Sequence, residues 1–202
     1  MRKTIAALTL SCALLLPIPA LAEGGPGAID AFRQSHTEVT QLVDAKADDE
    51  KIQLRVDELL DYEWIAQAAL GGPSKYAEVC GERCDEFKAL LTRLIRKNYL
   101  KRIEAKNRGK LEIVEEHVRD KATKVDTKVT FEDKEGQLKT VEVDYVMHKV
   151  DGRWHVRDII TEGVSLAKNY KYEISRIYAK GGMDEVIATL QKKVADLDAD
   201  AE

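Results

Sequence analysis

Three closely spaced segments near the middle of the chain alternate apolar and polar residues, and this alternation constrains the fold more than any other feature. The segments are 124–131, 141–148 and the stretch that begins at Arg153. A period of two is typical of strands with one buried face. The turn 133–136 separates the first two, and Asp151-Gly152 is a two-residue hairpin signal before the third. With a further strand over 111–118, the sequence predicts an antiparallel meander of about four strands.

Helical spacing frames this meander on both sides. Apolar residues recur every three or four positions over 29–43, 52–60, 62–70 and about 82–106, and again over 164–178 and 186–194. Gly71-Gly72-Pro73 and Gly181-Gly182 are expected to end helices. Helices followed by antiparallel strands and then by helices predict an α+β fold, with the helices packed on one face of the sheet.

The start of the chain predicts export. Arg2 and Lys3 precede an apolar run over 5–18, and Ala20-Leu21-Ala22 supplies a small-residue cleavage site. The run is shorter than the roughly 20 residues of a spanning helix. We therefore expect residues 1–22 to be a signal peptide and residues 23–202 to form a single domain, which is long enough for one sizeable core.

The charge balance argues against a nucleic-acid partner. Without Arg2 and Lys3, 30 basic residues face 36 acidic ones, which is a net charge near −6. The stretch from Arg93 to Lys110 is nevertheless rich in cations, with Glu104 as its only acid. Such a basic helix face is either simply solvated or a docking surface for an anionic partner or membrane.

Two cysteines, Cys80 and Cys84, remain after the signal peptide. In an oxidising compartment a disulfide is the expected state of this pair. So small a ring removes little chain entropy, so we expect it to staple the start of a helix rather than to dominate stability. The spacing differs from that of thioredoxin-like redox motifs, and a zinc site would lack ligands.

Asp158 is the leading candidate for chemistry. Strict alternation puts Trp154, Val156 and Asp158 on one face of their strand. A buried carboxylate must be paired, hydrogen-bonded or protonated. Asp158 could act as a general base in a cavity, or it could bind backbone N–H groups or an arginine at the strand-to-helix corner, where Gly163 supplies backbone freedom. We favour the structural role.

An anion site at the helix start is a second candidate, because exposed N–H groups after Gly163 could hold a phosphate. Glu162 argues against it, since its carboxylate would occupy the same position. The four histidines show no spacing typical of metal ligands, and no known catalytic motif is present. The sequence therefore indicates binding rather than catalysis, without a cofactor or metal.

One segment carries a family signature: Trp154 in a strand that ends in Asp158, then Glu162-Gly163-Val164-Ser165, then Asn169-Tyr170 in a helix. Val143-Asp144-Tyr145 and Gly181-Gly182 fit the same pattern, and 69–99 fits it more weakly. This pattern resembles the MlaC family of periplasmic phospholipid-transport proteins. The segment 72–84 departs from the family, so the cysteine pair looks like a local elaboration.

The resemblance implies a periplasmic, monomeric protein with a nuclear-transport-factor-2-like α+β cone around an apolar cavity. A phospholipid would be held there and carried between an outer-membrane lipoprotein complex and an inner-membrane ABC transporter complex, and no catalytic residue is implied. The expected lipid-binding residues are Leu91, Leu94, Val129, Phe131, Val143, Tyr145, Trp154, Val156, Val164 and Leu166. The alternatives are a cone-shaped enzyme with Asp158 or Asp144 as acid or base, and an assembly adaptor with a filled core.

Overall fold

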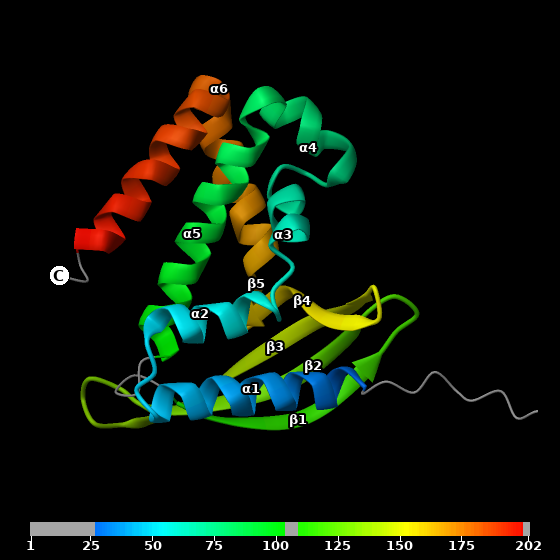
Figure 1. The fold of residues 1–202 in the computed structure, drawn as a ribbon, viewed down its shortest axis with the longest axis vertical. Coiled ribbons are helices and arrows are strands. Elements are labelled where there is room, and N and C mark those ends of the chain that lie inside the picture. Colours follow the sequence, from blue (N-terminus) through cyan, green and yellow to red (C-terminus); the bar gives the residue numbers. More distant parts are fainter. Residues whose placement is uncertain (1–26, 104–108, 200–202) are drawn as a thin grey trace, which may run out of the picture.

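The computed structural model describes residues 27–103 and 109–199, so the expected signal peptide lies outside the described residues. The helices are α1 (Ala28–Asp44), α2 (Asp49–Asp57), α3 (Tyr62–Ala69), α4 (Pro73–Cys80), a 3-10 turn (Gly81–Arg83), α5 (Cys84–Ile103) and α6 (Leu166–Ala199). The strands are β1 (Lys110–Val118), β2 (Thr123–Glu132), β3 (Leu138–Val150), β4 (Arg153–Thr161) and β5 (Val164–Ser165). The predicted α+β class is confirmed (Figure 1).

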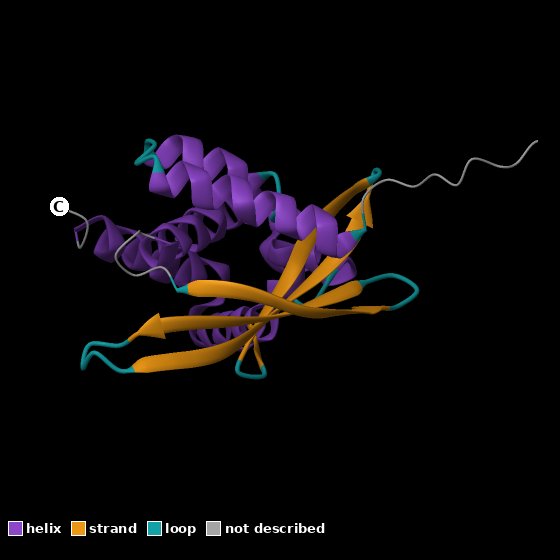
Figure 2. Cartoon of the chain, turned by 90° about the horizontal axis from the view of Figure 1, so that it is seen from below, coloured by secondary structure: helices purple, strands orange, loops and turns teal. Residues whose placement is uncertain are grey.

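The sheet is an antiparallel meander in the order β1-β2-β3-β4-β5. It has five strands rather than about four, because the two-residue β5 folds back on the end of β4. The predicted hairpin at Asp151-Gly152 is confirmed: both residues have positive φ, at 49° and 80°, as a type I′ turn requires. The strands are strongly twisted around one another (Figure 2).

A β-bulge in β4 overturns the predicted strict alternation of that strand. Val156 pairs with Met147, whereas Asp158 pairs with Val146, so Arg157 is the extra residue. Cross-strand partners share a face, so Val156 and Asp158 point to opposite faces of the sheet and Ile159 continues the face of Val156. The prediction that Asp158 shares a face with Trp154 was therefore wrong.

The two faces of the sheet differ sharply in chemistry. The inner face carries Val125, Tyr145, Met147 and Val156, which pack into one core with the helices. Helix α1 lies along this face (Figure 1), and its Phe32 ring is 4.3 Å from the ring of Tyr145. The outer face is polar. Helices α3, α5 and α6 complete the core beyond the β4 edge, where the chain around Leu60 pairs with Val156.

Helix α6 is interrupted where the sequence predicted a break. Gly181 and Gly182 have non-helical dihedral angles, and Gly182 has a positive φ of 65°. The second half of α6 folds back beside α5 (Figure 1), and its apolar residues Val186, Ile187 and Leu190 are buried. Within the described ranges, no helix has both the length and the hydrophobicity to cross a membrane.

Candidate functional site

The larger of two adjoining cavities, which we call the main cavity, lies where the sheet edge meets α3, α5 and α6, and its volume is about 240 Å³. Its walls are mostly apolar. The lining residues are Leu60, Ile65, Ile95, Asn98, Tyr99, Val156, Asp158, Ile159, Leu166, Asn169 and Tyr170. Asn169 is an exposed residue, so the cavity reaches the surface beside the first turn of α6.

A smaller cavity of about 30 Å³ adjoins the first, between α1 and the inner face of the sheet. The two cavities share Leu60, Tyr99, Val156 and Ile159 as lining residues. The smaller one continues past these shared walls towards the aromatic pair of α1 and β3. The two cavities thus lie against the same four side chains, and we call the pair together the joined cavity.

Two tyrosines, Tyr99 and Tyr145, line the joined cavity. Burial raises the pKa of the Tyr99 hydroxyl to about 12. The pKa of the Tyr145 hydroxyl is also raised, first by burial and then by the proximity of Tyr99. Both hydroxyls are therefore neutral at physiological pH, so neither is available there as a phenolate base.

The structure brings together three of the ten expected lipid-binding residues at the joined cavity: Tyr145, Val156 and Leu166. The strand pairing places Val129, Phe131, Val143 and Trp154 on the same inner face, away from the cavity lining. Leu91 and Leu94 are buried in helix packing, and Val164 is 63% exposed. These seven residues line neither cavity.

Sequence reasoning did not assign Leu60, Ile65, Ile95, Tyr99 and Ile159 to the cavity. Ile95 and Tyr99 belong to the apolar stripe of α5, so their burial was predictable, but their position against β4 depends on helix packing. Ile159 enters the site only because of the bulge at Arg157.

Asp158 forms hydrogen bonds at the junction between the sheet and the start of α6, which we call the α6 corner. Its Oδ1 accepts a hydrogen bond from the Ala167 N–H at 3.0 Å, and its Oδ2 accepts one from the Ser165 hydroxyl at 2.5 Å. The Ser165 oxygen in turn accepts a bond from the Lys168 N–H at 3.1 Å. Two side chains thus satisfy N–H groups that the first turn of a helix leaves unpaired.

The turn before this corner explains the role of Gly163. Glu162 and Gly163 both have positive φ, at 49° and 77°, and join β4 to β5 as a two-residue turn. The Glu162 carboxylate accepts a bond from the Glu142 N–H at 2.7 Å. The carboxylate at the α6 start is consequently that of Asp158, and the expectation that Glu162 occupies this position was wrong.

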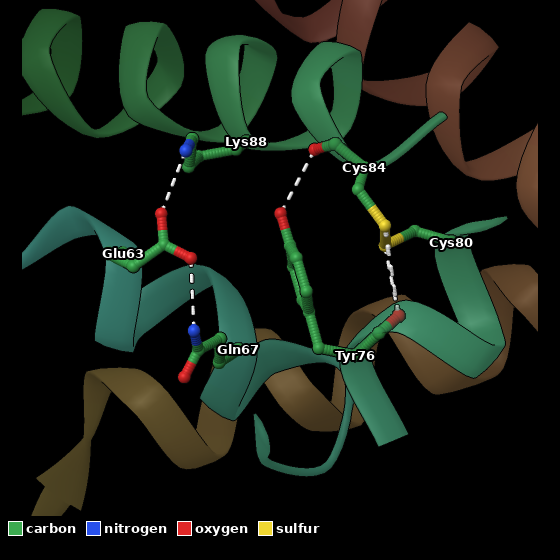
Figure 3. The surroundings of a disulfide bond; sticks show 6 residues. All are labelled: Glu63, Gln67, Tyr76, Cys80, Cys84 and Lys88. Atoms are coloured by element: carbon green, nitrogen blue, oxygen red, sulfur yellow. Dashed lines mark hydrogen bonds and ion pairs between the residues drawn. A yellow bond between two sulfur atoms is a disulfide. The ribbon is translucent and has the colours of Figure 1, made fainter. Parts of the chain in front are cut away.

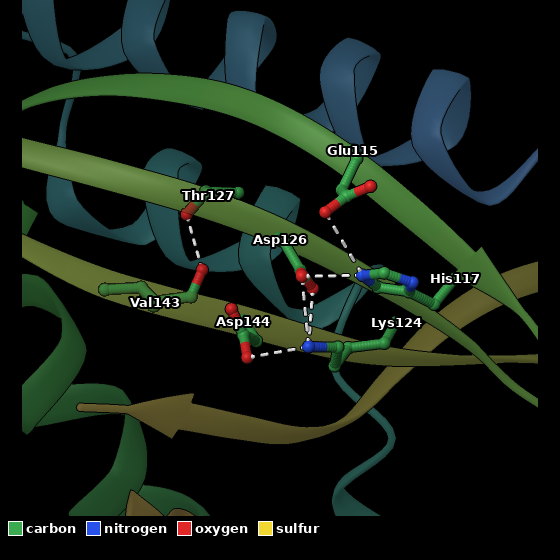
Figure 4. Close-up of polar contacts among 7 residues, drawn as sticks. All are labelled: Glu115, His117, Lys124, Asp126, Thr127, Val143 and Asp144. Carbon is green, nitrogen blue, oxygen red and sulfur yellow. Dashed lines mark hydrogen bonds and ion pairs between the residues drawn. The ribbon is translucent and has the colours of Figure 1, made fainter. Parts of the chain in front are cut away.

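A polar cluster covers the outer face of the sheet (Figure 4). His117 Nε2 lies 2.9 Å from an Asp126 oxygen and 3.5 Å from a Glu115 oxygen. Lys124 Nζ lies 2.9 Å from Asp126 and 3.2 Å from Asp144. The carboxylates of Asp126 and Asp144 are thus already paired with a cation. Asp144 lines neither part of the joined cavity.

The cysteines form a disulfide at the junction of α4 and α5 (Figure 3). Helix α4 itself was not predicted, because its eight residues carry only a weak apolar stripe. The Tyr76 hydroxyl donates a bond to the Cys84 carbonyl at 3.0 Å, across the same junction. Nearby, Lys88 on α5 bonds Glu63 on α3 at 2.7 Å. Covalent and polar links therefore fix this end of the helical layer.

The basic stretch of α5 is largely neutralised within the molecule. Arg93 lies 2.7 Å from Asp198 in α6, and Lys97 pairs with the same carboxylate. Arg96 forms a pair with Asp57 at 2.6 Å. In the described part of this stretch, these cations therefore tie α5 to its neighbours, while residues 104–108 lie outside the described ranges.

The model of the MlaC protein family matches residues 30–192, which is most of the sequence. The chain belongs to the MlaC family. The matched range includes every residue that lines the joined cavity of this MlaC-family protein. No curated protein matches the sequence significantly.

A solved structure supports the same fold for this MlaC-family chain. It is a phospholipid-binding protein from Ralstonia solanacearum, determined in complex with a phospholipid. The alignment has a TM-score of 0.70 and 18% identity, and it covers 85% of this chain and 98% of the other. At this identity the comparison shows a shared fold over nearly the whole length of the Ralstonia protein.

Proposed function

We propose that this MlaC-family protein binds a phospholipid by its acyl chains in the joined cavity and carries it through the periplasm. The observation that carries this proposal is the pair of mostly apolar cavities that share four lining residues, the larger of which reaches the surface at Asn169. Family membership and the phospholipid in the similar Ralstonia structure support the same ligand. The end points of transport would be an outer-membrane lipoprotein complex and an inner-membrane ABC transporter complex.

The physical need for such a carrier is large. Each methylene moved from a bilayer into water costs about 0.8 kcal/mol, so a phospholipid with roughly 30 methylenes faces on the order of 20 kcal/mol in crossing water alone. A carrier lowers this barrier with apolar walls and needs few polar contacts. The joined cavity has this composition.

Loading requires the walls of the joined cavity to separate. Its larger part, about 240 Å³, is below the roughly 300–1,000 Å³ typical of pockets for drug-sized ligands, and a phospholipid is larger still. Leu166 and Tyr170 on α6 line this space together with Ile95 and Tyr99 on α5. We infer that a shift of α6 against α5 admits the acyl chains.

We propose no catalytic role for Asp158 or Asp144. Both oxygens of Asp158 accept hydrogen bonds at the α6 corner, and Asp144 is paired with Lys124 on the outer face. An enzyme would need one of these carboxylates to act on a substrate in the cavity. Asp158 does border that space, but the Ser165 hydroxyl and the Ala167 N–H already occupy its two oxygens. An Asp158→Asn protein that folds and still carries lipid would exclude that alternative.

Solvent extraction of the purified protein tests the proposal. Protein prepared from its periplasmic source without added lipid should release phospholipid in a near-stoichiometric amount, as measured by mass spectrometry. Protein that is consistently empty, and that takes up none from phospholipid vesicles, would contradict the proposed function.

A further inference from the structure

The first half of α6 exposes a row of cationic and aromatic side chains. Lys168 lies three residues before Lys171 and four before Tyr172, and Tyr172 lies four before Arg176, so these side chains share one side of the helix. Val164 in β5 precedes this row and is 63% exposed, and Tyr172 is 60% exposed. We call these five residues the α6 stripe.

The α6 stripe borders the opening of the joined cavity. Asn169, which lines the cavity and is exposed, directly follows Lys168 in the chain. The opposite side of the same helix carries Ala167 and Ile174, which are buried. The stripe is therefore fixed in orientation by core packing, with the cavity opening at its flank.

The two lysines of the stripe are exposed. Within the described ranges, no carboxylate forms an ion pair with Lys168 or Lys171. Arg176 lies over the Tyr172 ring at 5.6 Å and forms an ion pair with the Glu173 carboxylate at 3.6 Å. The cations of α5 differ, because Arg93 and Lys97 are paired with Asp198.

We propose that the α6 stripe docks this protein on an anionic phospholipid surface. The lysines would meet lipid phosphates, while Tyr172 and Val164 would enter the layer between headgroups and acyl chains, where amphipathic and apolar side chains are favoured. This exposed pair of apolar groups favours a lipid surface over an acidic protein surface. Because the whole chain is acidic, with a formal net charge of −4, a cationic face would orient its approach.

Docking by this face would place the cavity opening against the membrane. That consequence rests on the proposed function, since it matters only if the cavity holds lipid. The docking itself does not depend on a loaded cavity. The two proposals can therefore fail separately.

Vesicle flotation tests the docking. The mature protein should float with vesicles containing one-third phosphatidylglycerol in phosphatidylcholine, and not with phosphatidylcholine alone. Each basic residue near an anionic surface contributes about fivefold to binding, so Lys168→Gln with Lys171→Gln should weaken it about 25-fold. Binding should also weaken as salt shortens the screening length from about 10 Å at 0.1 M to about 3 Å at 1 M.

A matched pair of lysines provides the control. Lys192 and Lys193 are exposed on the second half of α6, and Lys192→Gln with Lys193→Gln makes the same change in net charge. This control should retain most of the binding, whereas Tyr172→Ser should weaken it at both salt concentrations. Absence of flotation, or equal loss in the two lysine pairs, would overturn the docking. Extracted phospholipid in a protein that does not float would leave the proposed function standing.

Discussion

Asp158 and Ser165 are joined by a 2.5 Å hydrogen bond across the turn that links β4 to β5. The pair connects the last long strand to the first turn of α6, because Asp158 also binds the Ala167 N–H and Ser165 binds the Lys168 N–H. The wall of the joined cavity that α6 contributes is thus attached to the sheet through this pair. Its geometry decides where Leu166 and Asn169 lie.

Asp158→Ala is expected to destabilise the fold by about 1–3 kcal/mol, because it leaves the Ala167 N–H and the Ser165 hydroxyl without an acceptor. Asp158→Asn should cost less, since its amide oxygen can still accept from Ala167. Urea unfolding of both proteins measures the difference. Combined with Ser165→Ala in a double-mutant cycle, Asp158→Ala should show coupling of at least about 0.5 kcal/mol.

Asp196 supplies the control for this cycle. It is an exposed aspartate on the second half of α6, and Asp196→Ala should change the free energy of unfolding by no more than about 0.5 kcal/mol. If the effects of Asp158→Ala and Ser165→Ala on the free energy of unfolding simply add, the two residues are not energetically coupled.

Ile159→Trp is expected to abolish loading with phospholipid. Ile159 lines both parts of the joined cavity, so a larger side chain there fills the space that acyl chains need. Ile160→Trp is the matched control, because Ile160 pairs with Asp144 and so points to the outer face. Extraction and mass spectrometry should find lipid in the control and little in Ile159→Trp. Equal lipid in two folded variants would place the acyl chains elsewhere.

The contrast between Ile159 and Ile160 shows what the sequence could and could not predict. Alternation and helical spacing identified the strands, the hairpin at Asp151-Gly152 and the break at Gly181-Gly182, because each depends on local residue chemistry. The face of Ile159 depends on the bulge at Arg157, which has no local signature. Strict alternation therefore placed Asp158 on the wrong face of the sheet. It also failed to identify Ile159 as a cavity-lining residue.

The sequence predicted the family and the type of binding site, but it predicted only some of the lining residues. The resemblance around 154–170 led to the family, and the family model matches residues 30–192. Of the expected lining residues, Val156 and Leu166 border the main cavity. Leu60 borders it because the chain before α3 pairs with Val156, a contact between segments nearly one hundred residues apart. Such packing is not encoded in the periodicity of either segment.

His148 is expected to destabilise the fold as pH falls. Burial, and then the nearby charge of Arg157, lower its pKa below the ordinary 6.5, while Asp61 opposes this. The unfolded chain therefore binds a proton more readily, and stability should decline as pH drops from about 7 to about 5. His148→Gln should reduce this decline in urea unfolding. If it leaves the slope unchanged, other groups cause the loss.

The contribution of Arg157 can be measured separately in the folded protein. Arg157 bonds Asp61 at 2.8 Å and lies over the Trp64 ring, which stacks on His148. In Arg157→Gln the His148 pKa should rise, because a nearby positive charge is removed and Asp61 remains. Titration of the His148 ring signals by NMR checks the direction. A pKa that falls or stays constant would contradict the assigned cause.

Tyr99 is expected to destabilise the fold at high pH. Its pKa is ordinarily 10.0 and is raised to about 12 by burial, so the folded state retains a proton that the unfolded chain loses. Stability from this group is therefore complete below pH 10 and is lost as pH rises towards 12, by about 2 kcal/mol.

Tyr99→Phe cannot ionise, so its free energy of unfolding should fall less steeply over this range. Tyr172→Phe, which changes an exposed tyrosine, should follow the wild-type curve. Identical slopes in wild type and Tyr99→Phe would mean that the Tyr99 hydroxyl meets water, and hence that the joined cavity is open to solvent at its centre.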